Sequence, residues 1–370
     1  MNFTYDEELI DARDLARSIF TRESTLERIR EVDDSGDGFD LLLWGELAKA
    51  GLLGVALPES VDGAGLGFGG LCSVLIEQGA HLAQVPVWTT VVAAMTLLEF
   101  GPADLAAQIV PTVVDGRTRI TVAVEEFGSY DCSTPRCSAR RESDSWKLSG
   151  AKAVVPSFKG ADLVMVSAEM GSGPGLFLIE ADTAGVRWEA VDTTGRDGSG
   201  NLLLENATAV LVGEGRSGVL GWVLERARVA VAALQLGVAE RSLELSAKYV
   251  TSREQFGRPL GTFQAVQHQL ADSYMGIDAM RVCLWRAVEA IDSDERDETA
   301  SRIAKWWSDE QGAKVVDTTV HVHGGVGVDV DSPIHRYYLW GHQLARMLGG
   351  AGSELSGLGA ALTAKSTSVG

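Results

Sequence analysis

The spacing of apolar residues divides the chain into three regions. In the first, up to about residue 117, apolar side chains such as Leu15, Ile19 and Leu26 recur among charged residues at near-helical intervals, which predicts helices. A stretch rich in Gly, Pro and Asp at 58–70 predicts a loop, because these residues supply turn conformations. The apolar run 71–100 that follows predicts a further helical region.

From about residue 118 the pattern changes to short runs of β-favouring residues separated by Gly, Ser, Asp and Pro. These runs lie at 120–124, 146–155, 163–168, 176–179, 186–191 and 207–212. Their number within fewer than about a hundred residues predicts a compact β-barrel or sandwich.

The helical pattern returns at 219–253, where Gly237 lies inside an alanine- and leucine-rich segment. A glycine there weakens the helix but allows another backbone to approach closely. Further helices are predicted at 262–290, at 299–320 and after Pro333. The chain is thus predicted to have an α+β fold with an N-terminal helical domain (1–117), a central β-barrel domain (118–215) and a C-terminal helical domain (216–370).

Charge and composition narrow the function. The formal net charge is −19, with 51 acidic and 32 basic residues, so the chain should repel nucleic acid and anionic membranes. No apolar run approaches the ~18 residues of a membrane span, and the acidic, amphipathic first residues do not resemble a signal peptide. The four cysteines form no C-x-x-C pair and are expected to be free thiols in a reducing cytoplasm. The histidines lack the ligand spacing of a metal site, so no metal is expected.

Three ordered motifs are more specific than this layout. The segment 253–272 reads R-x-x-F-G, five residues, F-Q, six residues, A-D, and 44–65 reads W-x-x-L-x-x-x-G-L-L-G-V-A-L-P-E-x-x-x-G-x-G. The third, HVHGGVG, covers 321–327. Together they resemble the acyl-CoA dehydrogenase family from about residue 5 to 360. The resemblance implies that the C-terminal domain is a four-helix bundle that assembles an oligomer.

The resemblance also implies FAD as the cofactor, bound mainly against a neighbouring subunit. Arginine suits bidentate contact with the pyrophosphate, and glycine lets backbone approach a cofactor closely. On this basis the FAD-binding residues are Arg253, Gln255, Phe256, Leu260, Gln264, His321, Gly324 and Gly325.

The chain departs from the family at the catalytic base, the carboxylate that removes the α-proton of the acyl thioester. The usual glutamate of the Y-E-G-T turn corresponds to Gly349. In members that carry the base on the long helix instead, its position corresponds to Ala227. A two-residue shift would bring Glu225 into register, so Glu225 is retained as a weak candidate.

The contacts to the flavin ring are altered as well. The family's T-E-P-x-x-G-S-D loop is VEEFGSYD here (124–131), and its aromatic-I-T strand corresponds to 154–157, where Pro156 lacks an N–H donor. The turn's threonine is Ala351. What the chain would give to a neighbour's FAD is therefore kept, while its own flavin and base contacts are lost.

This pattern most resembles the non-catalytic subunits of actinobacterial heterotetrameric dehydrogenases that act on steroid side-chain CoA thioesters. It implies a homologous catalytic subunit as partner, a bulky acyl-CoA at the partner's site, and an electron-transfer protein as acceptor. One alternative is a self-sufficient homo-oligomeric dehydrogenase with an atypical base, Glu225 or Glu126. Another is a structural scaffold that binds neither flavin nor CoA.

Overall fold

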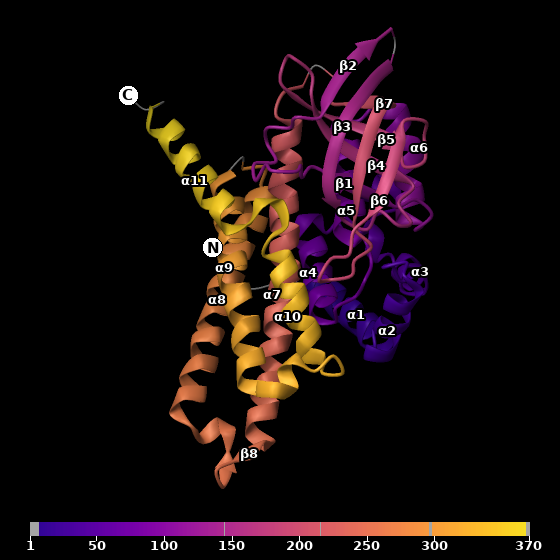
Figure 1. The fold of residues 1–370 in the computed structure, drawn as a ribbon. Helices are drawn as coiled ribbons and strands as arrows, with labels where there is room; N and C mark the ends of the chain where they lie inside the picture. The colour runs from indigo at the N-terminus through magenta and orange to yellow at the C-terminus, as the bar shows by residue number, and fades with distance from the viewer. Residues whose placement is uncertain (1–6, 144, 215, 296–297, 368–370) are drawn as a thin grey trace.

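The expected order of a helical, a β and a second helical region is confirmed. The computed structural model describes residues 7–143, 145–214, 216–295 and 298–367. In Figure 1 the strands and the first helices lie together on one side of the long helices α7, α8 and α9. The β8 hairpin forms the tip of this helical part, at the end remote from the strands.

The N-terminal helices are fixed by local caps and by a shared core. Asp40 caps α3 by accepting from the amides of Leu42 and Leu43, and Trp44 behind it donates to the carbonyl of Gly116 over 2.8 Å. The predicted loop ends earlier than expected, because α4 begins at Gly67. The bounds are α1 (Glu7–Glu23), α2 (Leu26–Ser35), α3 (Leu41–Lys49), η1 (Leu52–Gly54), η2 (Glu59–Val61), α4 (Gly67–Ala80), α5 (Val87–Phe100) and α6 (Ala103–Val114).

The strands close into a ring, as a barrel requires. Strand β4 pairs with β5, β5 with β7, β7 with β3, β3 with β2, and β2 meets β4 again at one residue pair; β1 and β6 flank this ring. Strand β2 is missing from the predicted runs, because its polar sequence SARRE carries no β-favouring pattern. The bounds are β1 (Ile120–Ala123), β2 (Ser138–Glu142), β3 (Ser145–Val155), β4 (Leu163–Glu169), β5 (Pro174–Glu180), β6 (Val186–Ala190) and β7 (Gly200–Val212).

The C-terminal region packs long helices against one another and against α4. The helix expected after Pro333 is divided in two, because Leu348 adopts a left-handed conformation (φ 60°) that a helix does not continue through. The bounds are α7 (Val219–Ser252), β8 (Glu254–Gln255), β9 (Arg258–Pro259), η3 (Leu260–Thr262), α8 (Gln264–Asp292), α9 (Glu298–His323), η4 (Gly324–Val328), α10 (Pro333–Leu344), η5 (Met347–Gly349) and α11 (Gly350–Thr367).

Candidate functional site

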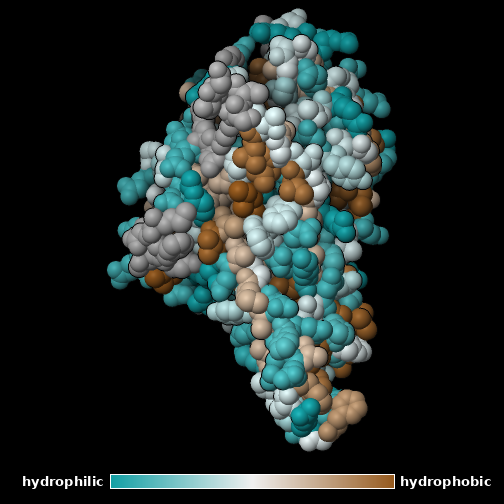
Figure 2. Space-filling view, turned by 90° about the vertical axis from the view of Figure 1, so that its left-hand side faces the viewer, coloured by the Kyte–Doolittle hydropathy of each residue, from teal (hydrophilic) through white to brown (hydrophobic). Residues whose placement is uncertain are grey.

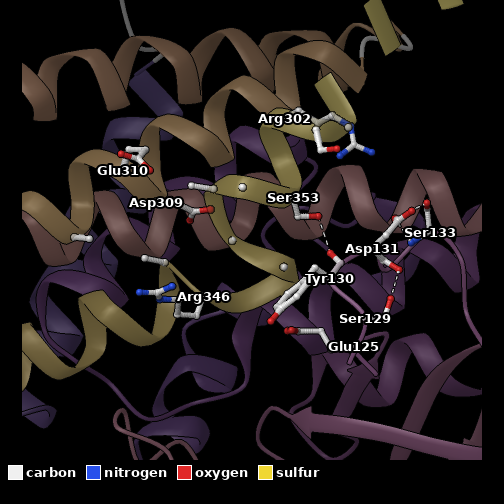
Figure 3. A pocket seen from close by; sticks show the side chains of 18 of the residues that line it. Glu125, Ser129, Tyr130, Asp131, Ser133, Arg302, Asp309, Glu310, Arg346 and Ser353 are labelled. Carbon is white, nitrogen blue, oxygen red and sulfur yellow. Dashed lines mark hydrogen bonds between the residues drawn. The ribbon is translucent and has the colours of Figure 1, made fainter. Parts of the chain in front are cut away.

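A large cavity opens between the β region and the long helices. Its volume is about 1520 Å³, and it is lined by the loop 125–133, by α9, by the end of α10 and by the start of α11. Figure 3 shows Asp309 and Glu310 reaching it from α9, and Glu125 and Tyr130 from the loop after β1. Small-molecule sites usually measure about 300–1,000 Å³, so this cavity is large enough to be the candidate site.

The wall of this cavity at position 349 has no room for a side chain. Gly349 has φ +94°, and a β-carbon built there would lie 2.1 Å from the carbonyl oxygen of Tyr130. The hydroxyl of Ser353 donates to that same carbonyl over 2.6 Å (Figure 3). With the loop in this place, the structure therefore excludes any side chain at the position where the resemblance puts the base.

The neighbouring residue ties the same two segments together. Leu348 is buried, and its amide donates to Oε1 of Glu125 over 3.0 Å. Burial raises the pKa of Glu125 above its ordinary value, and the hydrogen bond from Leu348 opposes this in part. The Glu125 carboxyl thus holds the turn before α11.

Little space is left next to the contact between Glu125 and Leu348. Two internal cavities there measure only about 50 and 10 Å³, and Trp88, Pro156 and Met347 line both. Most of the other lining residues are apolar too, including Leu234, Val122 and Leu348. Neither of these two cavities is large enough for an acyl group.

Glu126, one of the alternative bases, is held by structural contacts. Its Oε1 accepts from Nζ of Lys152 over 2.6 Å and from the amide of Cys137 over 3.0 Å, and Oε2 accepts from the amide of Arg136 over 2.8 Å. Burial opposes its ionisation, but the bonds from Lys152 and the two amides outweigh burial and lower its pKa. A carboxylate held in this way is a poor proton acceptor.

Glu225 lies on α7 with its carboxylate 3.6 Å from the guanidinium of Arg226, and it is not among the described residues that line the large cavity. Arg228, which aligns with the arginine beside the family's alternative base, is buried. It donates to Glu354 over 2.9 Å, and the other oxygen of Glu354 accepts from Arg302 over 3.0 Å. No carboxylate beside Arg228 on α7 reaches the cavity within the described residues.

A buried ion pair on α9, Lys305 with Asp309, borders the cavity through Asp309 and was not predicted. Lys305 is fully buried and lies 2.5 Å from Oδ1 of Asp309, while Oδ2 of Asp309 has no hydrogen-bond partner among the described residues. Burial raises the pKa of Asp309 to about 7, although Lys305 opposes the rise. The sequence did hold a signal, because Arg302, Lys305 and Asp309 recur at helical spacing on one face.

The residues predicted to bind FAD lie at the opposite end of the molecule. Arg253, Gln255 and Phe256 belong to the exposed hairpin of β8 and β9 at the tip in Figure 1. Near this hairpin the end of α9 packs against α7, where His323 stacks on Tyr249 with ring centroids 4.2 Å apart. None of the predicted set lines the large cavity; its exposed members are Arg253, Gln255, Phe256, Gln264, His321, Gly324 and Gly325, and Leu260 is half-buried.

This end of the molecule fits the phosphate side of a dinucleotide. The side chain of Arg253 is exposed, and its guanidinium has no partner among the contacts of the described residues. Around Gly324 and Gly325 nothing lies within 4 Å of a built β-carbon, so the backbone is open to a ligand. An unpaired guanidinium and open backbone are both groups that can contact a pyrophosphate.

Comparison with known proteins finds matches to one protein family in both helical regions of the chain. The family models "Acyl-CoA dehydrogenase, N-terminal domain" and "Acyl-CoA dehydrogenase, C-terminal domain" match residues 6–117 and 214–354. The chain is similar to acyl-CoA dehydrogenase FadE27 of Mycobacterium tuberculosis, with 37% identity over 97% of this chain and 98% of that protein.

Two solved structures share the fold closely. A variant of the Tcur3481-Tcur3483 steroid ACAD has a TM-score of 0.95 and 53% identity, covering 98% of this chain and 99% of that one. The ChsE4-ChsE5 complex from Mycobacterium tuberculosis has a TM-score of 0.92 and 36% identity, with coverage of 98% and 99%.

Proposed function

Since the chain belongs to the acyl-CoA dehydrogenase family, whose members are FAD-dependent oxidoreductases, we propose that it is a non-catalytic subunit of a heterotetrameric member. In this role it completes the FAD site of a homologous catalytic partner. The partner's site takes a bulky acyl-CoA of the steroid side-chain type, and an electron-transfer protein is the acceptor. Two structurally similar proteins support the proposal, the Tcur3481-Tcur3483 steroid ACAD and the ChsE4-ChsE5 complex.

The observation that carries the proposal is the contrast between the two ends of the molecule. At the hairpin, Arg253 is exposed and unpaired within the described residues, while a β-carbon at Gly349 would meet the carbonyl of Tyr130. FAD, when bound, accepts the hydride from the substrate. The chain's own contribution is to neutralise and orient the phosphate side of that cofactor through Arg253, Gln255 and the open backbone at Gly325.

The alternative of a self-sufficient dehydrogenase has little support. Glu126 is tied to Lys152 and two amides, and Glu225 lies outside the described lining of the cavity. A flavin-free scaffold would leave the exposed, unpaired Arg253 at the hairpin without a role.

The flavin absorbance of the purified chain, alone and co-purified with its candidate partner, tests the proposal. We expect about one flavin per pair of chains in the complex and none on the lone chain. Arg253→Ala should weaken FAD binding by the complex about 10- to 100-fold, because a hydrogen bond to a charged group is lost. Arg187→Ala, on β6 far from the hairpin, is the matched control and should keep its flavin.

Two outcomes would contradict the proposal. Flavin with turnover on the lone chain would establish a self-sufficient enzyme. A complex that forms without flavin would favour the scaffold.

A further inference from the structure

We propose that His323 is a positioning residue: its ring, stacked on Tyr249, holds the two segments that contact FAD in register with each other. These segments are the hairpin that carries Arg253 and the turn that begins at Gly324. The inference rests on the proposed function and adds to it a residue that fixes the geometry of the FAD-binding end. His323 was not among the residues predicted from the sequence, which included the exposed His321 instead.

The two segments belong to different helices. Arg253 ends α7, where its amide donates to the carbonyl of Tyr249 and its carbonyl accepts from the amide of Leu260, each over 2.8 Å. Gly324 directly follows α9, which ends at His323. Groups that bind one pyrophosphate must be held within roughly 0.5 Å of their productive places. The ends of α7 and α9 must therefore be fixed relative to one another.

The ring stack fixes these two helix ends. The ring centroids of His323 and Tyr249 are 4.2 Å apart, and their planes are 20° from parallel. Tyr249 lies one helical turn before Arg253, and His323 lies directly before Gly324. The stack therefore joins the helices immediately behind both segments. The side chain of His323 is buried, so its ring packs on Tyr249 rather than standing in water.

A hydrogen bond sets the orientation of the imidazole ring. Nδ1 of His323 lies 2.7 Å from the carbonyl oxygen of Thr319, and since a carbonyl only accepts, Nδ1 is the atom that donates. Burial lowers the pKa of His323, although this hydrogen bond opposes the change. The imidazole is therefore uncharged near neutral pH and is held in one orientation against Tyr249.

The turn after α9 folds back onto the same residue. A β-carbon built at Gly327 would lie 3.1 Å from the β-carbon of His323 and 2.6 Å from the carbonyl oxygen of Val320. Gly327 is buried, whereas Gly324 and Gly325 before it are exposed. The turn thus packs on His323 at one end and presents open backbone at the other. A displacement of His323 would therefore move the backbone that contacts the phosphates.

Titration of the flavin-free complex with FAD, followed by flavin fluorescence, tests the positioning role. His323→Ala should raise the Kd for FAD about tenfold, although Arg253 is intact. His323→Phe keeps a ring that can stack on Tyr249, so its Kd should stay within about twofold of wild type. His323→Asn keeps a donor for Thr319 but loses the ring, so it should behave like His323→Ala.

His81→Ala is the matched control. His81 stacks on Phe20 with the planes 21° apart, and its Nδ1 lies 2.8 Å from the carbonyl of Glu77, four positions earlier, as Nδ1 of His323 does with Thr319. It lies at the end of α4 and outside both FAD-binding segments. We expect His81→Ala to lower the stability of the chain without changing the Kd for FAD. Equal losses of affinity in His81→Ala and His323→Ala would mean that lost stability is the cause, and would overturn the positioning role.

Hydrogen exchange on the lone chain tests the same geometry without the cofactor. His323→Ala should accelerate exchange of the amides at 324–327 about fivefold. Tyr249→Leu removes the other ring of the stack and should do the same, which covers the case in which His323→Ala does not fold. Tyr249→Phe keeps the ring and should exchange like wild type. Unchanged exchange in Tyr249→Leu would overturn the proposal, because the turn would not depend on the stack.

The outcomes also separate this role from the proposed function. A wild-type complex without flavin would overturn the proposed function and the positioning role with it. A complex that holds flavin and keeps the same Kd in His323→Ala would overturn the positioning role alone. Full affinity in His323→Asn would do so too, because it would assign the effect to the hydrogen bond with Thr319 rather than to the ring.

Discussion

The buried pair of Lys305 and Asp309 shows how one side chain can make the stability of the whole chain depend on pH. Asp309 is 3% exposed, and one of its carboxylate oxygens lacks a partner within the described residues. Burial raises its pKa from an ordinary 3.8 to about 7, so the folded chain holds this proton over a range in which the unfolded chain has released it.

The sign of the pH effect follows from this difference. Between about pH 4 and 7 the folded state binds more protons at Asp309 than the unfolded state does, so the free energy of unfolding falls as pH rises, and it levels off above about 7. Asp309→Asn removes this contribution. We expect the difference in unfolding free energy, wild type minus variant, to decline across that window in urea titrations.

A matched control separates this group from the rest of the acidic surface. Glu59→Gln alters an exposed carboxyl of the N-terminal region, and its profile should run parallel to that of wild type. A parallel profile for Asp309→Asn would instead mean that the carboxyl is ionised over the whole range in the folded chain.

At the scale of the elements, two glycines set the distance between α4 and α7. A β-carbon at Gly237 would lie 1.9 Å from the carbonyl oxygen of Ile76, and one at Gly79 would lie 2.0 Å from that of Leu234. Each helix thus carries a glycine where the other helix's backbone passes. The close approach that Gly237 predicted is confirmed, and this crossing joins the N-terminal helices to the C-terminal ones.

Gly237→Ala is expected to lower the free energy of unfolding by about 3 kcal/mol, the upper end for overpacking, because the methyl group meets backbone that cannot yield by rotation. Gly221→Ala, in the first turn of the same helix with nothing within 4 Å, should change it by less than about 1 kcal/mol. Urea unfolding of both variants is the measurement. Similar values for the two would show that α4 and α7 can separate without loss.

The helices and strands also show which features can be predicted from the sequence. The helices around Gly237 and the strands of the ring follow from local periodicity, which each segment carries in itself. The glycine at position 349 was also evident from the sequence. The carbonyl of Tyr130 above it was not, because Ser353 and Tyr130 are 223 positions apart and the contact depends on the whole fold. For the same reason the pairing of Arg228 with Glu354 gave no local signal.

At the scale of the whole molecule, the outer face of the long helices carries apolar groups on an otherwise acidic chain. Figure 2 shows apolar patches among hydrophilic side chains on this face. The exposed apolar residues of α8 and α11 are Tyr274, Met275, Val282, Leu355 and Leu362. Among the described helices, none has the length and apolar character needed to cross a bilayer. Exposed apolar patches are typical of protein interfaces, which suits the proposed subunit role.

Phe256, at the tip of the molecule, is another exposed apolar side chain. It is 91% exposed and has φ +55°, a left-handed conformation that costs about 1–2 kcal/mol for a residue with a side chain. Because the ring is almost fully exposed, it contributes little burial energy to the stability of the lone chain. Strain of this kind is typical of functional sites, and under the proposed function the ring would contact the partner and its FAD.

Phe256→Gly should therefore separate stability from assembly. Glycine relieves the strained φ but adds about 0.5–1 kcal/mol of backbone entropy to the unfolded chain, so the unfolding free energy of the lone chain should stay within about 1 kcal/mol of wild type. Assembly and flavin content, measured by co-purification and absorbance, should fall, because the ring is gone. Phe256→Tyr keeps the ring and should keep both. If Phe256→Gly assembles normally, the ring has no role at the interface; if the lone chain loses much more stability, the ring serves its own fold.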